Sequence, residues 1–175
     1  MYFETAIMHF CKIDGHLLAL GSGYIYDVDK LPVNYALYDF VTEFNKIPTF
    51  IGVAVSGNRI LYSFTESLIL LEYIGNKCYI VDKIKNITGK VLIDRQNRFW
   101  VCSAKHGAIC FDNPNRDLSN PKIYLPGKKT TYMYEDNQGT YWFCTLDDGV
   151  YGLPQNAPMT WQQADGIPSE NLVSV

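Results

Sequence analysis

The chain has 175 residues, 47% of them hydrophobic and 19% charged, which is typical of a folded domain with a sizeable core. Its formal net charge of -3 offers no broad basic surface for phosphates, so nucleic acid is not an expected partner. No run reaches the roughly 18–20 apolar residues of a membrane helix, so we expect no membrane insertion by this chain.

The first half of the chain shows a rhythm of turn, strand, short gap and strand. Asp14-Gly15 is a strong signal for a two-residue hairpin turn and lies in a first repeat core near residues 13–27. Gly57-Asn58 begins a second core, near residues 57–71, with the same order of features. In this second core Leu61 takes the place that tryptophan has in the later copies.

The second half contains the same block twice, with an offset of 42 residues between Asp94 and Asp136. The same offset relates Trp100 to Trp142, and it defines repeat cores near residues 94–112 and 136–153. A β-propeller blade takes roughly 40–45 residues, and no segment shows convincing helical periodicity. The repeat therefore predicts a β-propeller.

Four antiparallel strands are expected in each of the two clearer repeats. The predicted strands are residues 90–93, 98–104, 108–111 and 122–125, then 131–135, 140–145, 150–153 and 159–162. Asn97 and Gly139 occupy equivalent turns, where a positive φ is required that these residues tolerate best. We predict an all-β fold, with residues 1–175 forming one partial or small propeller of about four blades.

The segment Gly166-Ile167-Pro168-Ser169 resembles the Gly-Leu-Pro-Ser-Asn string that leads into a repeat of the two-component regulator propeller family. We expect residues 166–175 to open a further repeat. The family pattern continues with Asp-x-x-Gly, Trp, Gly-Thr and a Gly-aliphatic-aromatic strand. Its main features are matched by Asp136, Gly139, Tyr141, Trp142, Phe143, Thr145, Gly149 and Tyr151, and less closely by Asp94, Phe99, Trp100, Val101, Ser103, Gly107 and Ile109.

The sequence also departs from the family pattern in a consistent way. Cys102 and Cys144 stand where the family usually has glycine, and Asn97 replaces the turn glycine. The resemblance covers about residues 90–175, whereas the first half agrees only in its rhythm.

The resemblance implies a non-catalytic sensor region of a bacterial hybrid two-component system, located in the periplasm or otherwise outside the cytoplasm, with an oligosaccharide as ligand. No signal peptide is recognisable in the sequence. The family usually has seven blades, so we expect this chain to be part of a larger propeller. Exposed blade edges then favour self-association.

The five cysteines include no C-x-x-C pair, which indicates buried thiols rather than a disulfide framework or a zinc knuckle. A bridge between Cys102 and Cys144 is a less favoured alternative, because equivalent positions in neighbouring blades can lie too far apart. His9, His16 and His106 lack the spacing of a metal site and are expected in solvated turns. We therefore expect no metal ion and no cofactor.

Catalytic residues are not apparent. Asp147 and Asp148 are adjacent and are expected to form a turn, and no Gly-x-Ser-x-Gly motif or phosphate-binding loop is present. Trp100 and Trp142 recur at one strand position, which indicates packing between blades before any contact with a ligand. Tyr24, Tyr26, Tyr132 and Tyr134 are further aromatic candidates for a surface, and no ligand-binding residue is assigned.

Two functional hypotheses follow. The first is ligand sensing without catalysis. The alternative is a protein-interaction or scaffold module without a small ligand, favoured by the lack of convergent polar residues. A propeller lyase or hydrolase has the least support.

Overall fold

The computed structural model describes residues 6–30, 36–112 and 117–154 and the backbone of residues 159–160. Strands make up 59% and helices 6% of the structure, which confirms the predicted all-β class. Within the described residues the strands form four antiparallel sheets of four strands each. The predicted opening of a further repeat at residues 166–175 lies outside them.

The sheets follow one another along the chain. The first contains β1 (Ile7–Ile13), β2 (His16–Gly21), β3 (Tyr24–Asp27) and β4 (Ala36–Asp39), and the second contains β5 (Phe50–Ser56), β6 (Arg59–Phe64), β7 (Ser67–Ile74) and β8 (Lys77–Lys85). The third contains β9 (Lys90–Ile93), β10 (Phe99–Ser103), β11 (Gly107–Phe111) and β12 (Lys122–Tyr124), and the fourth contains β13 (Thr130–Glu135), β14 (Tyr141–Thr145), β15 (Val150–Leu153) and β16 (Met159–Thr160). In every sheet, neighbours in the sheet are also neighbours in the chain.

The turns between first and second strands are of two kinds. In the first sheet Ile13 pairs with His16, so Asp14 (φ 51°) and Gly15 (φ 84°) form the predicted two-residue hairpin turn. In the third and fourth sheets a longer turn contains Asn97 (φ 61°) and Gly139 (φ 83°), which confirms the expected positive φ at both positions.

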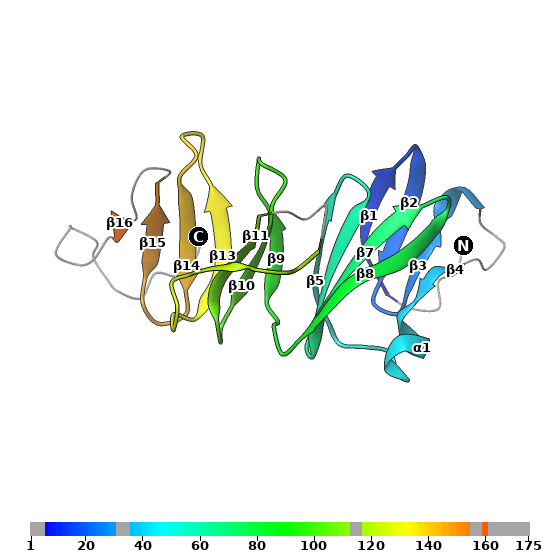
Figure 1. The fold of residues 1–175 in the computed structure, drawn as a ribbon, viewed down its shortest axis with the longest axis horizontal. Helices are drawn as coiled ribbons and strands as arrows, with labels where there is room; N and C mark the ends of the chain where they lie inside the picture. Colours follow the sequence, from blue (N-terminus) through cyan, green and yellow to red (C-terminus); the bar gives the residue numbers. More distant parts are fainter. Residues whose placement is uncertain (1–5, 31–35, 113–116, 155–158, 161–175) are drawn as a thin grey trace.

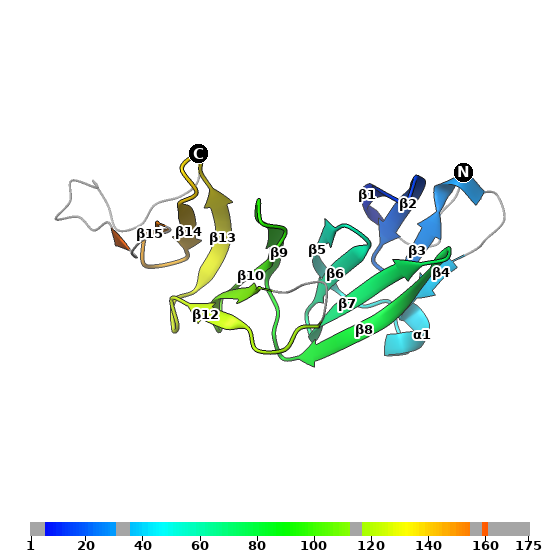
Figure 2. The same ribbon diagram turned by 45° about the horizontal axis from the view of Figure 1, so that its top comes forward.

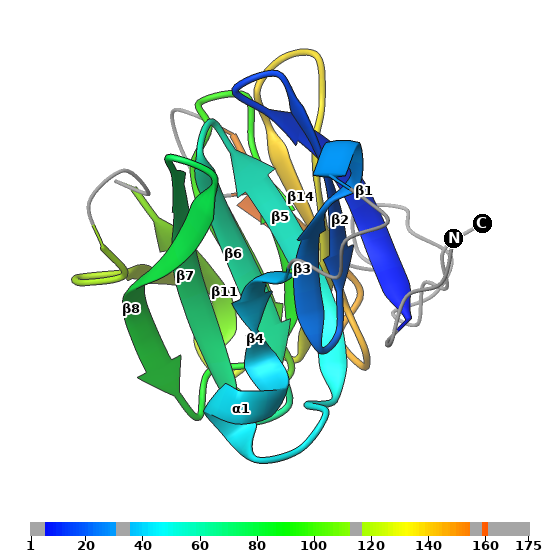
Figure 3. The same cartoon turned by 90° about the vertical axis from the view of Figure 1, so that its right-hand side faces the viewer.

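The four sheets lie side by side in chain order, with the first and the fourth at opposite ends of the long axis (Figure 1, Figure 2). Viewed along this axis, the first sheet lies in front of the second, and strands of the third and fourth lie behind (Figure 3). The first strands contact one another from β5 to β9 and from β9 to β13. The described residues therefore form an open arc of propeller blades, as the fold prediction allowed.

Apolar residues fill the spaces between successive sheets. One cluster includes Leu18 and Tyr62, a second Leu61 and Phe99, and a third Trp100 and Phe143. All residues of β6, β10 and β11 are buried, because both faces of these central strands are covered by a neighbouring sheet. This two-sided burial explains why these strands read as nearly continuous apolar runs.

The equivalent tryptophans differ in their surroundings. Trp100 is 1% exposed and packs against Tyr141 and Phe143 of the next sheet, at centroid distances of 5.1 and 5.5 Å. This confirms Trp100 as a blade-packing residue. Trp142 is only partly buried.

The structure contains two short helical elements that the sequence analysis did not identify, η1 (Val28–Lys30) and α1 (Phe40–Phe44). The α1 turn starts at Asp39, whose carboxylate accepts a hydrogen bond of 3.0 Å from Thr42 N, and ends at Asn45, with φ 56°. Such a single turn is too short to show helical periodicity. Among the described helices none is long and apolar enough to cross a membrane.

All five cysteines are free, so the alternative bridge between Cys102 and Cys144 is not formed. Cys78, Cys102 and Cys110 are buried, in agreement with the expected buried thiols, whereas Cys11 and Cys144 are partly exposed. Burial raises the pKa of Cys78 and of Cys102 to about 12 in each case.

Candidate functional site

A pocket lies between the third and fourth sheets, beside the turn that joins β9 to β10. Its volume is about 400 Å³, within the range of roughly 300–1,000 Å³ that is usual for small-molecule sites. The lining residues are Gln96, Arg98, Trp100, Tyr124, Tyr141, Leu153 and Pro154. The pocket thus combines aromatic rings with a few polar groups from two blades.

Asp94 organises the inner wall of this pocket. It is 5% exposed; its Oδ1 accepts a hydrogen bond from Arg98 N at 2.8 Å, and its Oδ2 accepts from Arg98 Nε at 2.6 Å. The Trp100 indole Nε1 also donates to Oδ2, at 2.8 Å. One buried carboxylate therefore holds both the guanidinium and the indole that line the pocket.

A chain of hydrogen bonds crosses from the third sheet to the fourth. Arg98 Nη2 donates to Tyr141 Oη at 2.5 Å, and Tyr141 Oη donates to Gln96 Oε1 at 2.7 Å. Burial, followed by the charge of Asp94, raises the pKa of Tyr141 to about 12. Its hydroxyl therefore stays protonated at neutral pH and remains a donor.

The charges around the pocket are nearly balanced. Arg98 pairs with Asp94 at 2.6 Å and with Asp112 at 3.6 Å, and Asp112 also pairs with Lys122 at 2.5 Å. Two cations and two anions thus neutralise one another at this end of the third sheet. A ligand with a large net charge of either sign would gain little from such a site.

Three aromatic rings line the pocket, those of Trp100, Tyr124 and Tyr141. The centroids of the Trp100 and Tyr124 rings are 5.2 Å apart, with planes inclined at 37°. Tyr141, like Trp100, is almost fully buried. Trp100 is almost fully buried, whereas Tyr124 is partly exposed. Tyr124 is therefore the ring that is accessible to a ligand, and the buried Trp100 ring packs against it.

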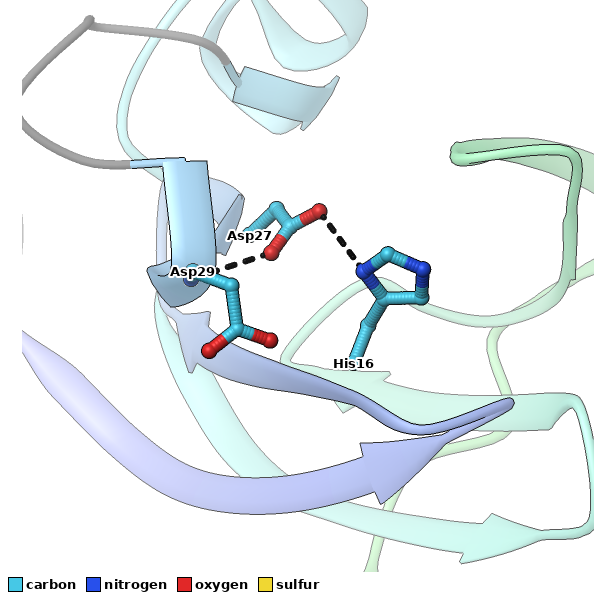
Figure 4. A group of neighbouring side chains, drawn as sticks. All are labelled: His16, Asp27 and Asp29. Carbon is cyan, nitrogen blue, oxygen red and sulfur yellow. Dashed lines mark hydrogen bonds and ion pairs between the residues drawn. The ribbon is translucent and has the colours of Figure 1, made fainter.

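A second group of polar side chains lies in the first sheet, where the β1–β2 turn meets the end of β3 and η1 (Figure 4). His16 Nδ1 is 3.3 Å from Asp27 Oδ2, and Asp27 Oδ1 accepts a hydrogen bond of 3.1 Å from Asp29 N. The Asp29 carboxylate accepts a hydrogen bond of 3.0 Å from Leu17 N. One nitrogen of His16 and one oxygen of each aspartate lie within 4.8 Å of one another.

The other candidates from the sequence do not gather at a site. His9 is exposed on β1, and His106 Nε2 lies 3.1 Å from the carbonyl oxygen of Asn86. Asp147 and Asp148 lie between β14 and β15, as expected for turn residues, and pair with different lysines, Lys129 and Lys128. The four candidate tyrosines are also divided, Tyr24 and Tyr26 lying on β3 and Tyr132 and Tyr134 on β13.

Sequence reasoning assigned none of the pocket residues to a ligand site, although it named Trp100 and Tyr141 as features of the repeat. Arg98 has Thr140 as its counterpart in the next repeat, so the guanidinium is one of the features that the two copies do not share. A difference between otherwise similar repeats is the signal that could have drawn attention to it. His16, Asp27 and Asp29 were missed because their proximity depends on the pairing of β2 with β3.

Comparison with solved structures finds similar folds at low sequence identity. The extracellular domain of BT3049 from B. thetaiotaomicron, named as a hybrid two-component system, matches with a TM-score of 0.64 and 13% identity. That match covers 97% of this chain and 25% of the other. PorZ of Porphyromonas gingivalis, a surface component of the type-IX secretion system, matches with a TM-score of 0.58 and 13% identity, over 87% of this chain and 21% of PorZ.

These similarities establish a shared fold. The chain spans about a quarter of the length of the first structure and about a fifth of the second. No protein-family model matches the sequence, and a search of curated proteins finds no match either.

Proposed function

We propose that this chain is part of an extracytoplasmic sensor of the two-component regulator propeller type, and that its pocket around Tyr124 binds a saccharide. The observation that carries the proposal is the pocket itself, which places an aromatic ring beside hydrogen-bonding groups from two blades. The repeat pattern and the fold shared with an extracellular domain of a two-component system support a sensing role.

The chemistry of the pocket favours an uncharged polyhydroxyl ligand. Sugar rings present apolar C–H faces that pack on aromatic rings, and their hydroxyl groups both donate and accept hydrogen bonds. Tyr124 offers the ring, and Gln96 and Arg98 offer an amide and guanidinium N–H groups. The balanced charges of Arg98, Lys122, Asp94 and Asp112 disfavour strongly ionic ligands.

The same wall favours binding over catalysis. Among the described pocket residues, no nucleophile is paired with a general base, and the carboxylate of Asp94 is already engaged by Arg98 and Trp100. A ligand that contacts Tyr124 in the third sheet and Leu153 in the fourth would instead stabilise the contact between two blades. A sensor can transmit such a change to a region outside this chain.

Binding to a glycan panel, followed by calorimetry, tests the proposal. We expect micromolar affinity for at least one neutral oligosaccharide, and a loss of tenfold or more in Gln96→Ala and Tyr124→Ala. Tyr134→Ala is the matched control, because Tyr134 is an exposed tyrosine of β13 that does not line the pocket. Equal affinity in all three variants would show that the saccharide binds outside this pocket. No binding across a broad panel would reject saccharide sensing by this pocket.

Exposed apolar side chains favour a second candidate function, association with another protein surface. Several of them lie on first strands, namely Met8, Phe10, Ile93, Tyr132 and Tyr134. A second copy of the chain is the partner that we propose for this surface and for the blade edges. Light scattering should then give a mass above the 20.0 kDa of one chain. A strict monomer at high concentration would exclude it.

A further inference from the structure

The group in the first sheet points to a different kind of ligand from that of the pocket. We propose that His16, Asp27 and Asp29 bind a divalent transition-metal ion of the zinc type. One imidazole nitrogen and two carboxylate oxygens, all within 4.8 Å of one another, are a donor set that such ions accept. This site is independent of the saccharide pocket, which lies between the third and fourth sheets.

The buried carboxylate of Asp27 is the second observation that supports a site here. Its side chain is 0% exposed, and Oδ2 accepts no hydrogen bond from any described group. Its two nearest nitrogen neighbours, His16 Nδ1 at 3.3 Å and Lys30 Nζ at 3.1 Å, approach it without hydrogen-bond geometry. A buried carboxylate oxygen is normally satisfied by hydrogen bonds, and a coordinated cation would satisfy this one.

The distances fit a small divalent ion. Two ligand atoms bound to tetrahedral zinc at about 2.0–2.1 Å lie about 3.4 Å apart. His16 Nδ1 and Asp27 Oδ2 already lie 3.3 Å apart. All three ligand atoms lie within 4.8 Å of one another, so the exposed Asp29 side chain would need to move by no more than about 1.4 Å to complete the set.

Neighbouring groups orient the proposed ligands. Asp29 N donates to Asp27 Oδ1, and Leu17 N donates to Asp29 Oδ2. Such hydrogen bonds from backbone groups fix ligating carboxylates in metal sites. Three protein ligands leave a fourth position for water, and the imidazole favours zinc over calcium or magnesium, which prefer oxygen ligands.

Lys30 is the group with which a metal ion would compete. With His16 neutral, Asp27 and Asp29 carry two negative charges and Lys30 one positive charge, so the group has a net negative charge. The Lys30 side chain is 38% exposed and can move into water. The proposal therefore predicts that removing this ammonium group strengthens metal binding, which a merely structural ion pair does not predict.

Calorimetric titration of the whole chain with Zn²⁺ tests the site. We expect one ion per chain, at least tenfold weaker binding in His16→Gln, and threefold to tenfold tighter binding in Lys30→Gln. His9→Gln is the matched control, because His9 is exposed on β1 of the same sheet and should leave the affinity unchanged. Circular dichroism of each variant confirms that the sheet is intact.

Cobalt substitution separates this site from binding by the free cysteines. Co²⁺ bound to nitrogen and oxygen ligands shows no sulfur-to-metal charge-transfer band, whereas thiolate ligation does. Zinc binding that is unchanged in His16→Gln, a strong thiolate band with Co²⁺, or the absence of zinc binding in both the wild type and Lys30→Gln would overturn the proposal. None of these outcomes bears on saccharide binding by the pocket.

Discussion

Asp94 and Asp136 hold the tryptophans of their own repeats in the same way, each accepting a hydrogen bond of 2.8 Å from the indole Nε1 of Trp100 or Trp142. Each aspartate also accepts a backbone hydrogen bond from the residue four positions later, Arg98 N at 2.8 Å and Thr140 N at 2.9 Å. In both repeats, one aspartate carboxylate thus stabilises the turn through a backbone hydrogen bond and also fixes the position of the tryptophan ring. The two copies differ in burial.

Replacing these aspartates should therefore give unequal effects. The Asp94 side chain is 0% exposed and pairs with Arg98, so Asp94→Ala removes the acceptor that Arg98 Nε and the Trp100 indole share. We expect a loss of about 3 kcal/mol in the free energy of unfolding, since breaking a buried pair typically costs roughly 3–5 kcal/mol. Asp136→Ala, in a solvated turn, should cost clearly less. Urea denaturation of both variants measures the difference, and equal losses would contradict this account.

Asp136 also predicts a dependence of stability on pH. The hydrogen bond from the Trp142 indole lowers the pKa of this carboxyl below 3.8, and backbone hydrogen bonds from Thr140 and Gln138 act in the same direction. A depressed pKa in the folded state contributes stability above the ordinary pKa that is lost as the pH falls through the folded value. The stabilising effect of Asp136 should therefore be complete near neutral pH and disappear below 3.8.

Thermal unfolding of the wild type and Asp136→Asn tests this sign. The wild type should be the more stable protein near pH 6, and the two melting temperatures should converge as the pH is lowered toward about 3. Other carboxylates are common to both proteins, so they cancel in the difference. A gap that is constant or that widens on acidification would show that Asp136 does not ionise as described.

The repeat pattern predicted the strands of the third and fourth sheets well, because turns at Asn97 and Gly139 demand particular backbone conformations that leave a local signature. In the third sheet the bounds of β10, Phe99–Ser103, lie within one residue of the predicted 98–104. The pocket was not predictable, because Arg98 meets Tyr141 across two sheets and 43 residues of chain. The repeat spacing can indicate that a residue packs between blades, but it does not identify which side chain of the next blade that residue meets.

The cysteines provide a prediction about chemical reactivity. Burial raises the pKa of Cys102 to about 12 and of Cys11 to about 11, so little thiolate is present at neutral pH. We expect a disulfide reagent to modify the native chain slowly, with the partly exposed Cys144 first, and all five thiols rapidly in urea. Mass spectrometry identifies the modified residue. Loss of the fastest phase in Cys144→Ser supports the assignment, and rapid native labelling of Cys102 contradicts it.

Gly107, at the start of β11, lies very close to the backbone of Tyr124 and Leu125. Tyr124 lines the pocket. A Cβ atom at position 107 would lie 2.4 Å from the carbonyl oxygen of Leu125 and 2.6 Å from that of Tyr124. Gly127 has nearly the same φ, 80° against 84°, but its Cβ would meet nothing within 4 Å. Alanine substitutions at the two positions therefore distinguish the cost of backbone strain, which both share, from the cost of steric overlap, which only Gly107→Ala has.

Gly127→Ala should cost about 1 kcal/mol, the strain of an alanine at positive φ. Gly107→Ala should cost about 1–3 kcal/mol more, because β11 and β12 must separate to admit the methyl group. That separation would also displace Tyr124 from the pocket, so Gly107→Ala should weaken saccharide binding while Gly127→Ala leaves it unchanged. Urea denaturation and calorimetry of the two variants measure both effects. Equal stability of the two proteins would show that a methyl group at position 107 does not overlap the backbone of Tyr124 and Leu125.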